Sequence, residues 1–275
     1  MIYKRAIGAG FLSKEESNLT EKQQNHILRT VDLTKSFGKQ IAVNKVNLDI
    51  CTGEFVSIIG PNGAGKTTFF NLITGAFKPD CGAIYFKGQD ITKAKEFNRV
   101  QMGMARCFQI TNVFPHISVL ENVRLAVQAK SKHKYRLFIN ADKLKKLTEY
   151  AHYCLEMVQL KSMQSHLAVS LTHANQRKLE IAIQLASQGE LMLLDEPTAG
   201  MSAEEVPMIV EVVKDIRKKE KKTIVMVEHK LNMVLSLSDH IAVMNYGALI
   251  AYGSPREIQE NKDVQSAYLG RKGEA

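Results

Sequence analysis

The sequence predicts an α/β fold with a mostly parallel sheet at its core, an antiparallel β region and a helical subdomain. Short apolar runs of strand length occur at Phe55–Ile59 and Thr223–Val227. Between residues 95 and 190 the hydrophobic spacing shifts toward about 3.6 residues, which is typical of helices. From residue 191 to 244 strand and helix patterns alternate, which indicates βαβ crossovers and therefore parallel strands.

The first 95 residues carry strand patterns and one short helix. His26–Phe37 and residues 42–50 alternate in hydrophobicity and contain β-branched residues, so we expect them to pair as strands. Phe55–Ile59 leads directly into a glycine-rich loop. Residues 67–74 then have helical apolar spacing, and Gly75 is expected to cap the C-terminus of that helix.

The remaining chain divides into a helical segment and a second group of strands. Residues 95–190 contain almost no proline and predict a mostly helical insertion. The helix expected over 204–222 ends in a cluster of lysine and arginine, which suits a helix C-terminus and indicates a solvated face. Strand patterns return at residues 191–194, 223–227, 241–244 and 249–252.

Composition excludes several classes of protein. Of the 275 residues, 45% are hydrophobic and 24% are charged, as in globular proteins, so a chain disordered throughout is excluded. No apolar run approaches the roughly 18–20 residues that span a bilayer. The four cysteines lack C-x-x-C spacing, which argues against a zinc or thioredoxin-like site. The net charge of +9 favours an anionic partner such as nucleic acid, nucleotide or phospholipid without choosing among them.

A glycine-rich segment after Phe55–Ile59 fits the pattern G-x-x-x-x-G-K-[ST]. Its glycines allow the backbone to curl so that successive N–H groups point at phosphate oxygens. Lys66 would reach the β- and γ-phosphates, the Thr67 hydroxyl would coordinate Mg²⁺, and the following helix adds its positive N-terminal end. The segment predicts a P-loop NTPase that binds ATP through Gly60, Pro61, Asn62, Gly63, Ala64, Gly65, Lys66, Thr67 and Thr68.

Two consecutive carboxylates narrow the choice among kinases, GTPases and motor ATPases. The apolar strand at residues 191–194 ends in Asp195 and Glu196. In this position Asp195 would hold Mg²⁺ through water, and Glu196 would orient or deprotonate the attacking water.

Five further motifs follow the phosphate loop in a fixed order, and together they resemble an ABC-transporter ATP-binding subunit over about residues 27–270. The fold that this resemblance implies is the P-loop NTPase fold of ABC type. The motifs are the glutamine loop at Gln109, the signature at 171–177, the acidic pair Asp195-Glu196, the D-loop at 199–202 and the switch histidine His229.

Residues 108–115, 177–182, 197–201 and the tail from 245 to 270 resemble the ATPases of branched-chain amino-acid importers more specifically. Lipopolysaccharide-export and urea-import ATPases are close relatives and stay open as alternatives. A soluble ABC ATPase that acts on ribosomes or DNA is a further alternative from another class.

The resemblance implies roles for individual residues. The catalytic residues would be Glu196, His229 and Gln109, and a neutral His229 imidazole can donate one hydrogen bond to the γ-phosphate. Phe37 would stack on adenine, and Gln109 would begin a segment that faces the transmembrane partner. The Mg²⁺ ligands would be Thr67, Gln109 and Asp195.

The signature segment departs from the L-S-G-G-Q pattern of the family. Its residues Thr172, Ala174 and Asn175 would contact the γ-phosphate of ATP held by the opposite subunit. Ala174 replaces a glycine, so its Cβ is expected to stand where backbone approaches phosphate closely. The sequence therefore predicts a weakened ATP site at this signature.

The resemblance also implies a domain plan and partners. Residues 26–270 would form the ABC ATP-binding domain, with a nucleotide-binding core at 26–95 and 191–270, a helical subdomain at about 96–190, a polar N-terminal extension at 1–25 and a tail at 271–275. The partners would be transmembrane permease subunits, a second ATP-binding subunit in a homo- or heterodimer and, indirectly, an external solute-binding protein, with no nucleic acid. The chain would lie peripherally at the cytoplasmic face of the cell membrane. The basic stretch at 124–146 would be a solvated helical surface or would attract anionic lipid.

Overall fold

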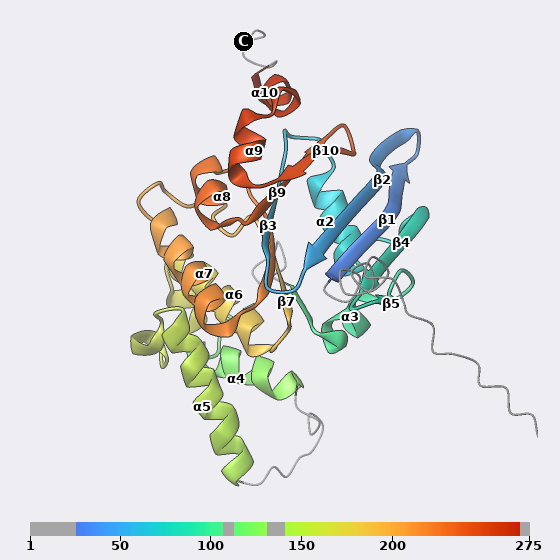
Figure 1. Ribbon diagram of the computed structural model, residues 1–275. Coiled ribbons are helices and arrows are strands. Elements are labelled where there is room, and N and C mark those ends of the chain that lie inside the picture. The colour runs from blue at the N-terminus through green and yellow to red at the C-terminus, as the bar shows by residue number, and fades with distance from the viewer. Residues whose placement is uncertain (1–25, 107–112, 131–140, 270–275) are drawn as a thin grey trace, which may run out of the picture.

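The computed structural model describes residues 26–106, 113–130 and 141–269 (Figure 1). Within these residues the larger sheet has six strands, and β3, β7 and β8 are buried along their whole length. These three strands and β6 and β9 run parallel, whereas β10 is antiparallel to β9. Their continuous apolar sequences are what a parallel sheet covered on both faces requires. In spatial order the strands are β10 (Ala248–Gly253), β9 (His240–Asn245), β3 (Phe55–Ile59), β8 (Thr223–Val227), β7 (Leu191–Asp195) and β6 (Met104–Arg106).

A smaller antiparallel sheet faces the larger one across α2 (Lys66–Thr74), as Figure 1 shows. The buried side chains of α2, among them Phe69 and Phe70, share one hydrophobic core with both sheets. Gly75 ends α2 in the left-handed conformation, as predicted. The smaller sheet orders its strands β2 (Gln40–Cys51), β1 (His26–Phe37), β4 (Cys81–Phe86) and β5 (Gln89–Asp90).

Most helices gather at the side of the large sheet away from β1 and β2, whereas α2 and α3 lie toward the smaller sheet (Figure 1). A second core joins the apolar faces of these helices to β7 and β8. The part before β7 contains α3 (Glu96–Met102), α4 (Val119–Lys130), α5 (Ala141–Met157), the 3₁₀ turns Lys161–Met163 and Ala168–Ser170, and α6 (His173–Ala186). The later helices are α7 (Val206–Glu220), α8 (Leu231–Leu237), α9 (Pro255–Glu260) and α10 (Lys262–Leu269).

The predicted α/β fold, with a mostly parallel core and an antiparallel region, is confirmed, and one element differs from the expectation. The segment at 96–190 is mostly helical, but it contains β6, which pairs in parallel with β7 in the core sheet. A strand of three residues leaves too short a pattern to be distinguished from a helix turn. The expected N-terminal extension at 1–25 and the tail at 271–275 lie outside the described residues.

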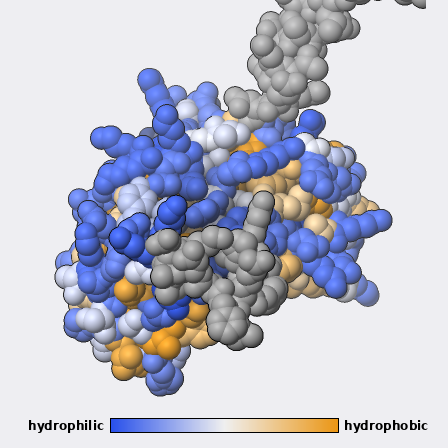
Figure 2. All heavy atoms as spheres, turned by 90° about the horizontal axis from the view of Figure 1, so that it is seen from below, coloured by the Kyte–Doolittle hydropathy of each residue, from blue (hydrophilic) through white to orange (hydrophobic). Residues whose placement is uncertain are grey.

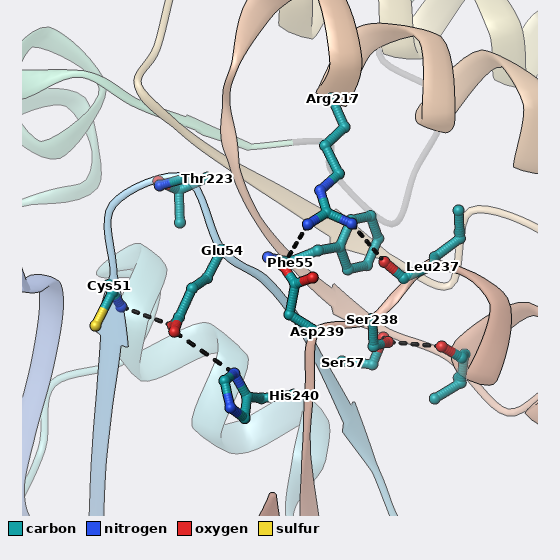
Figure 3. Close-up of polar contacts among 12 residues, drawn as sticks. Cys51, Glu54, Phe55, Ser57, Arg217, Thr223, Leu237, Ser238, Asp239 and His240 are labelled. Atoms are coloured by element: carbon teal, nitrogen blue, oxygen red, sulfur yellow. Dashed lines mark hydrogen bonds and ion pairs between the residues drawn. The ribbon is translucent and has the colours of Figure 1, made fainter. Parts of the chain in front are cut away.

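A polar network fixes the amino-terminal ends of the central strands, at the opposite edge from the phosphate loop (Figure 3). Arg217 of α7 donates hydrogen bonds to Asp239 and to the carbonyl oxygen of Leu237, and the Asp239 carboxylate also accepts the N–H of Phe55. The network therefore joins α7 to the starts of β3 and β9.

The parallel direction of β3, β7 and β8 brings their carboxyl ends to one edge of the sheet. The loops that follow them hold the phosphate loop, Glu196 and His229, respectively. Ligands of open α/β sheets bind at this edge. In the part of the chain that the structure describes, no helix is both long enough and apolar enough to cross a membrane.

Candidate functional site

The phosphate loop runs from the end of β3 to the start of α2 and fits closely against two neighbouring segments. A Cβ added to Gly60 would lie 2.2 Å from the carbonyl oxygen of Met244, and one added to Gly65 would lie 2.1 Å from that of Ala42. Both residues also have positive φ, 153° and 96°. Only glycine meets both requirements, which explains these two positions of the motif.

Lys66 lies under this loop with 5% of its surface exposed. Its Nζ atom donates hydrogen bonds to the carbonyl oxygens of Gly60 at 2.8 Å and Pro61 at 3.0 Å. Burial lowers the pKa of Lys66, and the nearby Glu196 carboxylate partly opposes that shift. No side chain caps the N-terminus of α2, so its first N–H groups and the Lys66 ammonium together offer an anion-binding cradle.

A cleft of about 360 Å³ opens above the cradle. It brings together several of the sequence-predicted site residues: Phe37, the loop at 62–68, Glu196 and His229. Phe37 is 48% exposed and meets the ring of Phe77 edge to face, with centroids 5.5 Å apart. The half-exposed Phe37 ring is accessible at the cleft, and the Nζ atom of Lys35 lies 5.6 Å from its centroid. Gln40 and Ala42 also line the cleft; both escaped the sequence analysis, because neither belongs to a motif.

Glu196 and His229 meet at the mouth of the cleft. The Nε2 atom of His229 lies 3.1 Å from Oε1 of Glu196. The preceding carboxylate, Asp195, is 6% exposed, and both of its oxygen atoms are buried. The two acids thus occupy different environments: Asp195 is the last, buried residue of β7, and Glu196 begins the loop that follows.

The signature residues lie at the start of α6, away from the cleft. Thr172 caps the N-terminus of α6, and its hydroxyl accepts the N–H of Asn175 at 3.4 Å. Thr172 is exposed, whereas Ala174 is 3% exposed and belongs to the helical core. None of Thr172, Ala174 and Asn175 lines the cleft, so a single copy does not join them to the phosphate loop.

The burial of Ala174 bears on one sequence-based prediction. Its Cβ was expected to stand where backbone approaches a phosphate of the opposite subunit. In the single chain this side chain is buried in the first turn of α6, and the weakened ATP site stays a prediction. Gln109, which was predicted to be both catalytic and a metal ligand, lies outside the described residues.

The sequence analysis singled out His229 but neither of its neighbours. Glu228 is 3% exposed and contacts Thr198, and Lys230 contacts carbonyl oxygens of the loop after Glu196. The sequence did contain a signal for Glu228, because it is a carboxylate that directly follows the apolar strand Thr223–Val227.

Two family profiles match this chain. The one described as "ABC transporter" matches residues 43–199, and the one described as "Branched-chain amino acid ATP-binding cassette transporter" matches residues 248–274. The high-affinity branched-chain amino acid transport ATP-binding protein BraF of Pseudomonas aeruginosa is 36% identical over 252 residues, which cover 89% of this chain and 98% of BraF. The protein of the same description from Escherichia coli, LivG, is 37% identical over 251 residues, with the same two coverages.

Solved structures agree with the sequence matches. The ADP conformation of MJ1267, an ATP-binding cassette of an ABC transporter, matches with a TM-score of 0.78 and 29% identity, covering 90% of this chain and 99% of that one. A dimeric post-hydrolysis state of the cassette MJ0796, bound to ADP and Pi, matches with a TM-score of 0.71 and 27% identity, covering 83% and 99%. The expected P-loop fold of ABC type is thereby confirmed. The chain belongs to the ABC transporter family and is one of its nucleotide-binding, ATP-hydrolysing subunits.

Proposed function

We propose that this chain hydrolyses ATP to energise an importer of branched-chain amino acids. The observation that carries the substrate class is the similarity to BraF and LivG over 89% of the chain, together with the profile match at 248–274. The observation that carries the chemistry is the Glu196–His229 contact at the mouth of a cleft lined by the phosphate loop.

The geometry supports a role for each residue around the cleft. Lys66 and the N-terminal N–H groups of α2 bind the β- and γ-phosphates, since all of them present positive charge to one cradle. Phe37 stacks on adenine with its exposed ring. Glu196 orients or deprotonates the attacking water, and His229 contacts both Glu196 and the γ-phosphate.

The donor set fits Mg²⁺ as the cofactor. Thr67 offers a hydroxyl at the cleft, and Asp195 offers a buried carboxylate at the end of β7. These are the hard oxygen ligands that Mg²⁺ prefers, and Gln109 would add an amide oxygen. When bound, Mg²⁺ supplies positive charge that offsets the charge of the β- and γ-phosphates.

A second ATP-binding subunit completes the site in this proposal. Thr172 and Asn175 lie at the N-terminus of α6, outside the cleft of their own chain. A helix N-terminus at the surface suits a phosphate held by another copy or by a related subunit. The dimeric MJ0796 structure supports such an arrangement.

Permease subunits dock on the helical side in the same proposal. Residues 113–118 and 167–169 lie side by side, joined by the Ser118–Leu167 bridge, and expose Phe114, Leu167 and Val169. Clustered exposed apolar side chains of this kind mark interaction surfaces. The face seen in Figure 2 is mainly hydrophilic, with hydrophobic residues gathered at the lower left and at the upper right. Docking places the chain peripherally at the cytoplasmic face of the cell membrane, with the external solute-binding protein engaged only through the permease and no nucleic acid involved.

A transport assay tests this proposal. The chain, tagged and purified from membranes together with its permease subunits, is reconstituted in vesicles with ATP and Mg²⁺ on the side of the ATPase. We expect uptake of radiolabelled leucine when the solute-binding protein is added. Urea uptake or lipopolysaccharide extraction without leucine transport would instead favour one of the two related classes, and co-purification with ribosomes would favour a non-transport ATPase.

A further inference from the structure

The two residues that flank His229 both reach across to the loop that follows Glu196. This loop, residues 196–201, leaves β7, and the segment 227–230 leaves β8, the neighbouring parallel strand. Glu228 and Lys230 make these contacts from either side of His229. The side chains on both sides of His229 are therefore anchored to the loop that begins with Glu196.

Glu228 is the buried half of this connection. Its Oε1 atom accepts the hydroxyl of Thr198, which is fully buried, and its Oε2 atom accepts the backbone N–H of His229 at 3.2 Å. Burial and the nearby charge of Glu196 raise the pKa of Glu228, and the two hydrogen bonds and the charge of Lys230 only partly oppose that rise. A buried carboxylate is stable only where hydrogen-bond donors satisfy its oxygen atoms, and both oxygen atoms of Glu228 have such a donor.

Lys230 is the more exposed half. Its Nζ atom donates hydrogen bonds to the carbonyl oxygens of Thr198 at 3.3 Å and Met201 at 3.1 Å. The N–H of Met201 in turn donates to the carbonyl oxygen of Thr198 at 3.2 Å, so these atoms form one turn of the loop. Lys230 therefore caps a backbone turn rather than an acidic side chain.

The loop needs such support because its first residue has a strained backbone. Glu196 has a φ of 46°, in the left-handed region that residues with a Cβ rarely adopt. Its N–H donates to the carbonyl oxygen of Val227 at 2.9 Å, and the N–H of Ala199 donates to its carbonyl oxygen at 3.0 Å. A strained conformation persists only where surrounding contacts determine it, and such residues cluster at functional sites.

We propose that Glu228 and Lys230 are positioning residues that hold the carboxylate of Glu196 against His229 for ATP hydrolysis. They act through Thr198 and the turn at 198–201, not through contact with ATP. The inference rests on the proposed function of Glu196. It adds two residues, Glu228 and Lys230, that set the distance between Glu196 and His229.

Thr198→Val tests the buried contact, because valine has nearly the shape of threonine and replaces its hydroxyl group with a methyl group. Thr198→Ser, which keeps the hydroxyl, is the rescue variant. Thr30→Val is the matched control, since the Thr30 hydroxyl is equally buried and hydrogen-bonds Val46 and Leu48 in the distant antiparallel sheet. We expect Thr198→Val to lower kcat for MgATP about tenfold or more with KM within twofold, because small misplacements of a reacting group are costly. Thr198→Ser and Thr30→Val should keep wild-type kcat.

Lys230→Met tests the exposed half in the same assay on the full-length chain. Its matched control is Lys130→Met, because Lys130 also donates from Nζ to two backbone carbonyl oxygens, those of Val100 and Gln101. We expect a several-fold loss of kcat for Lys230→Met and none for Lys130→Met, at equal ATP affinity. Lys230→Arg should restore at least half of the lost rate.

A third comparison shows whether the effect passes through Glu196. When Glu196→Gln has already removed the carboxylate, adding Thr198→Val should not lower the residual rate further, because residues that act as a unit are not additive. If Glu196→Gln leaves hydrolysis intact, the proposed function of Glu196 fails. If Glu196→Gln abolishes turnover but Thr198→Val and Lys230→Met behave like their controls, the positioning inference alone is overturned. Equal losses of kcat in Thr198→Val and Thr30→Val would likewise overturn it, because a general loss of folding would then explain both.

Discussion

Lys66 and Arg99 are buried cations whose nitrogen atoms donate hydrogen bonds to backbone carbonyl oxygens. Lys66 bonds two carbonyl groups of its own loop, and the Arg99 guanidinium bonds those of Leu72, Ile73, Ala94, Ile91 and Thr92. Burial lowers the pKa of both, that of Arg99 to about 10. The difference lies in access: Lys66 lines the cleft and can bind an anion, whereas Arg99 is enclosed and serves the fold.

Lys66→Ala is therefore expected to weaken ATP binding. A charge-assisted hydrogen bond to phosphate contributes about 1.5–3 kcal/mol, so the dissociation constant should rise roughly 10- to 100-fold. Titration calorimetry with MgATP measures this, with Lys130→Ala as the control. Equal affinities of the wild type and Lys66→Ala would refute the role of Lys66.

Ala174→Gly is expected to reduce stability without accelerating hydrolysis. The Ala174 side chain packs in the helical core near the start of α6, so its removal costs packing and adds backbone entropy, about 1 kcal/mol together. Urea unfolding and the ATPase rate of the assembled transporter are the measurements, with Ala182→Gly in the same helix for comparison. A clear increase in rate would restore the sequence-based expectation that this Cβ obstructs a phosphate.

At the scale of helices and strands, the sequence predicted the features that depend only on residues close together in the chain. The strand Phe55–Ile59, the phosphate loop and the Gly75 cap were all visible for this reason. The contacts of Arg99 with α2 and of Glu228 with Thr198 were not visible. They join residues about 26 to 30 positions apart, and only tertiary packing brings such residues together.

Arg99 makes the link between α3 and the C-terminal end of α2 testable. Its Nη1 atom lies 2.7 Å from the carbonyl oxygen of Leu72 and 2.6 Å from that of Ile73. Arg99→Met would leave these buried acceptors without their donor, and we expect a loss of about 3 kcal/mol in the free energy of unfolding. Arg29→Met, which removes an exposed ion pair with Asp49, should cost less than about 1 kcal/mol in the same urea titration. Similar losses in the two variants would contradict this account of Arg99.

At the scale of the whole molecule, two sheets and a helical side direct three loops to one edge of the larger sheet (Figure 1). The sequence predicted this architecture, because alternating strand and helix patterns restrict the sheet to parallel strands. It could not predict the inward direction of Ala174 or the support that Glu196 receives, since both depend on how whole elements pack.

The basic character of the molecule should produce only weak binding to lipid. In the described part of the basic stretch, Arg124 forms an ion pair with Glu121 and Lys130 donates to backbone carbonyl oxygens, so neither cation is fully available, whereas Lys145 and Lys146 are exposed. At physiological salt, charges more than about 8 Å apart are screened. We expect little flotation of the purified chain with phosphatidylserine-containing vesicles, and clear flotation when the vesicles carry the permease subunits. Strong flotation with empty vesicles that resists added salt would contradict docking through a protein partner.

The central claim is that Glu196, held against His229 at the mouth of the cleft, activates water for ATP hydrolysis. The most direct measurement compares Glu196→Gln with the wild type in ATP binding and in steady-state turnover, with the exposed acid variant Glu156→Gln as the control. Removing a general base typically costs about 10²- to 10⁴-fold in rate. We predict ATP affinity within about twofold of wild type, turnover reduced at least 100-fold and an ATP-trapped dimer in size-exclusion chromatography, with Glu156→Gln unchanged. Wild-type turnover by Glu196→Gln would contradict the claim.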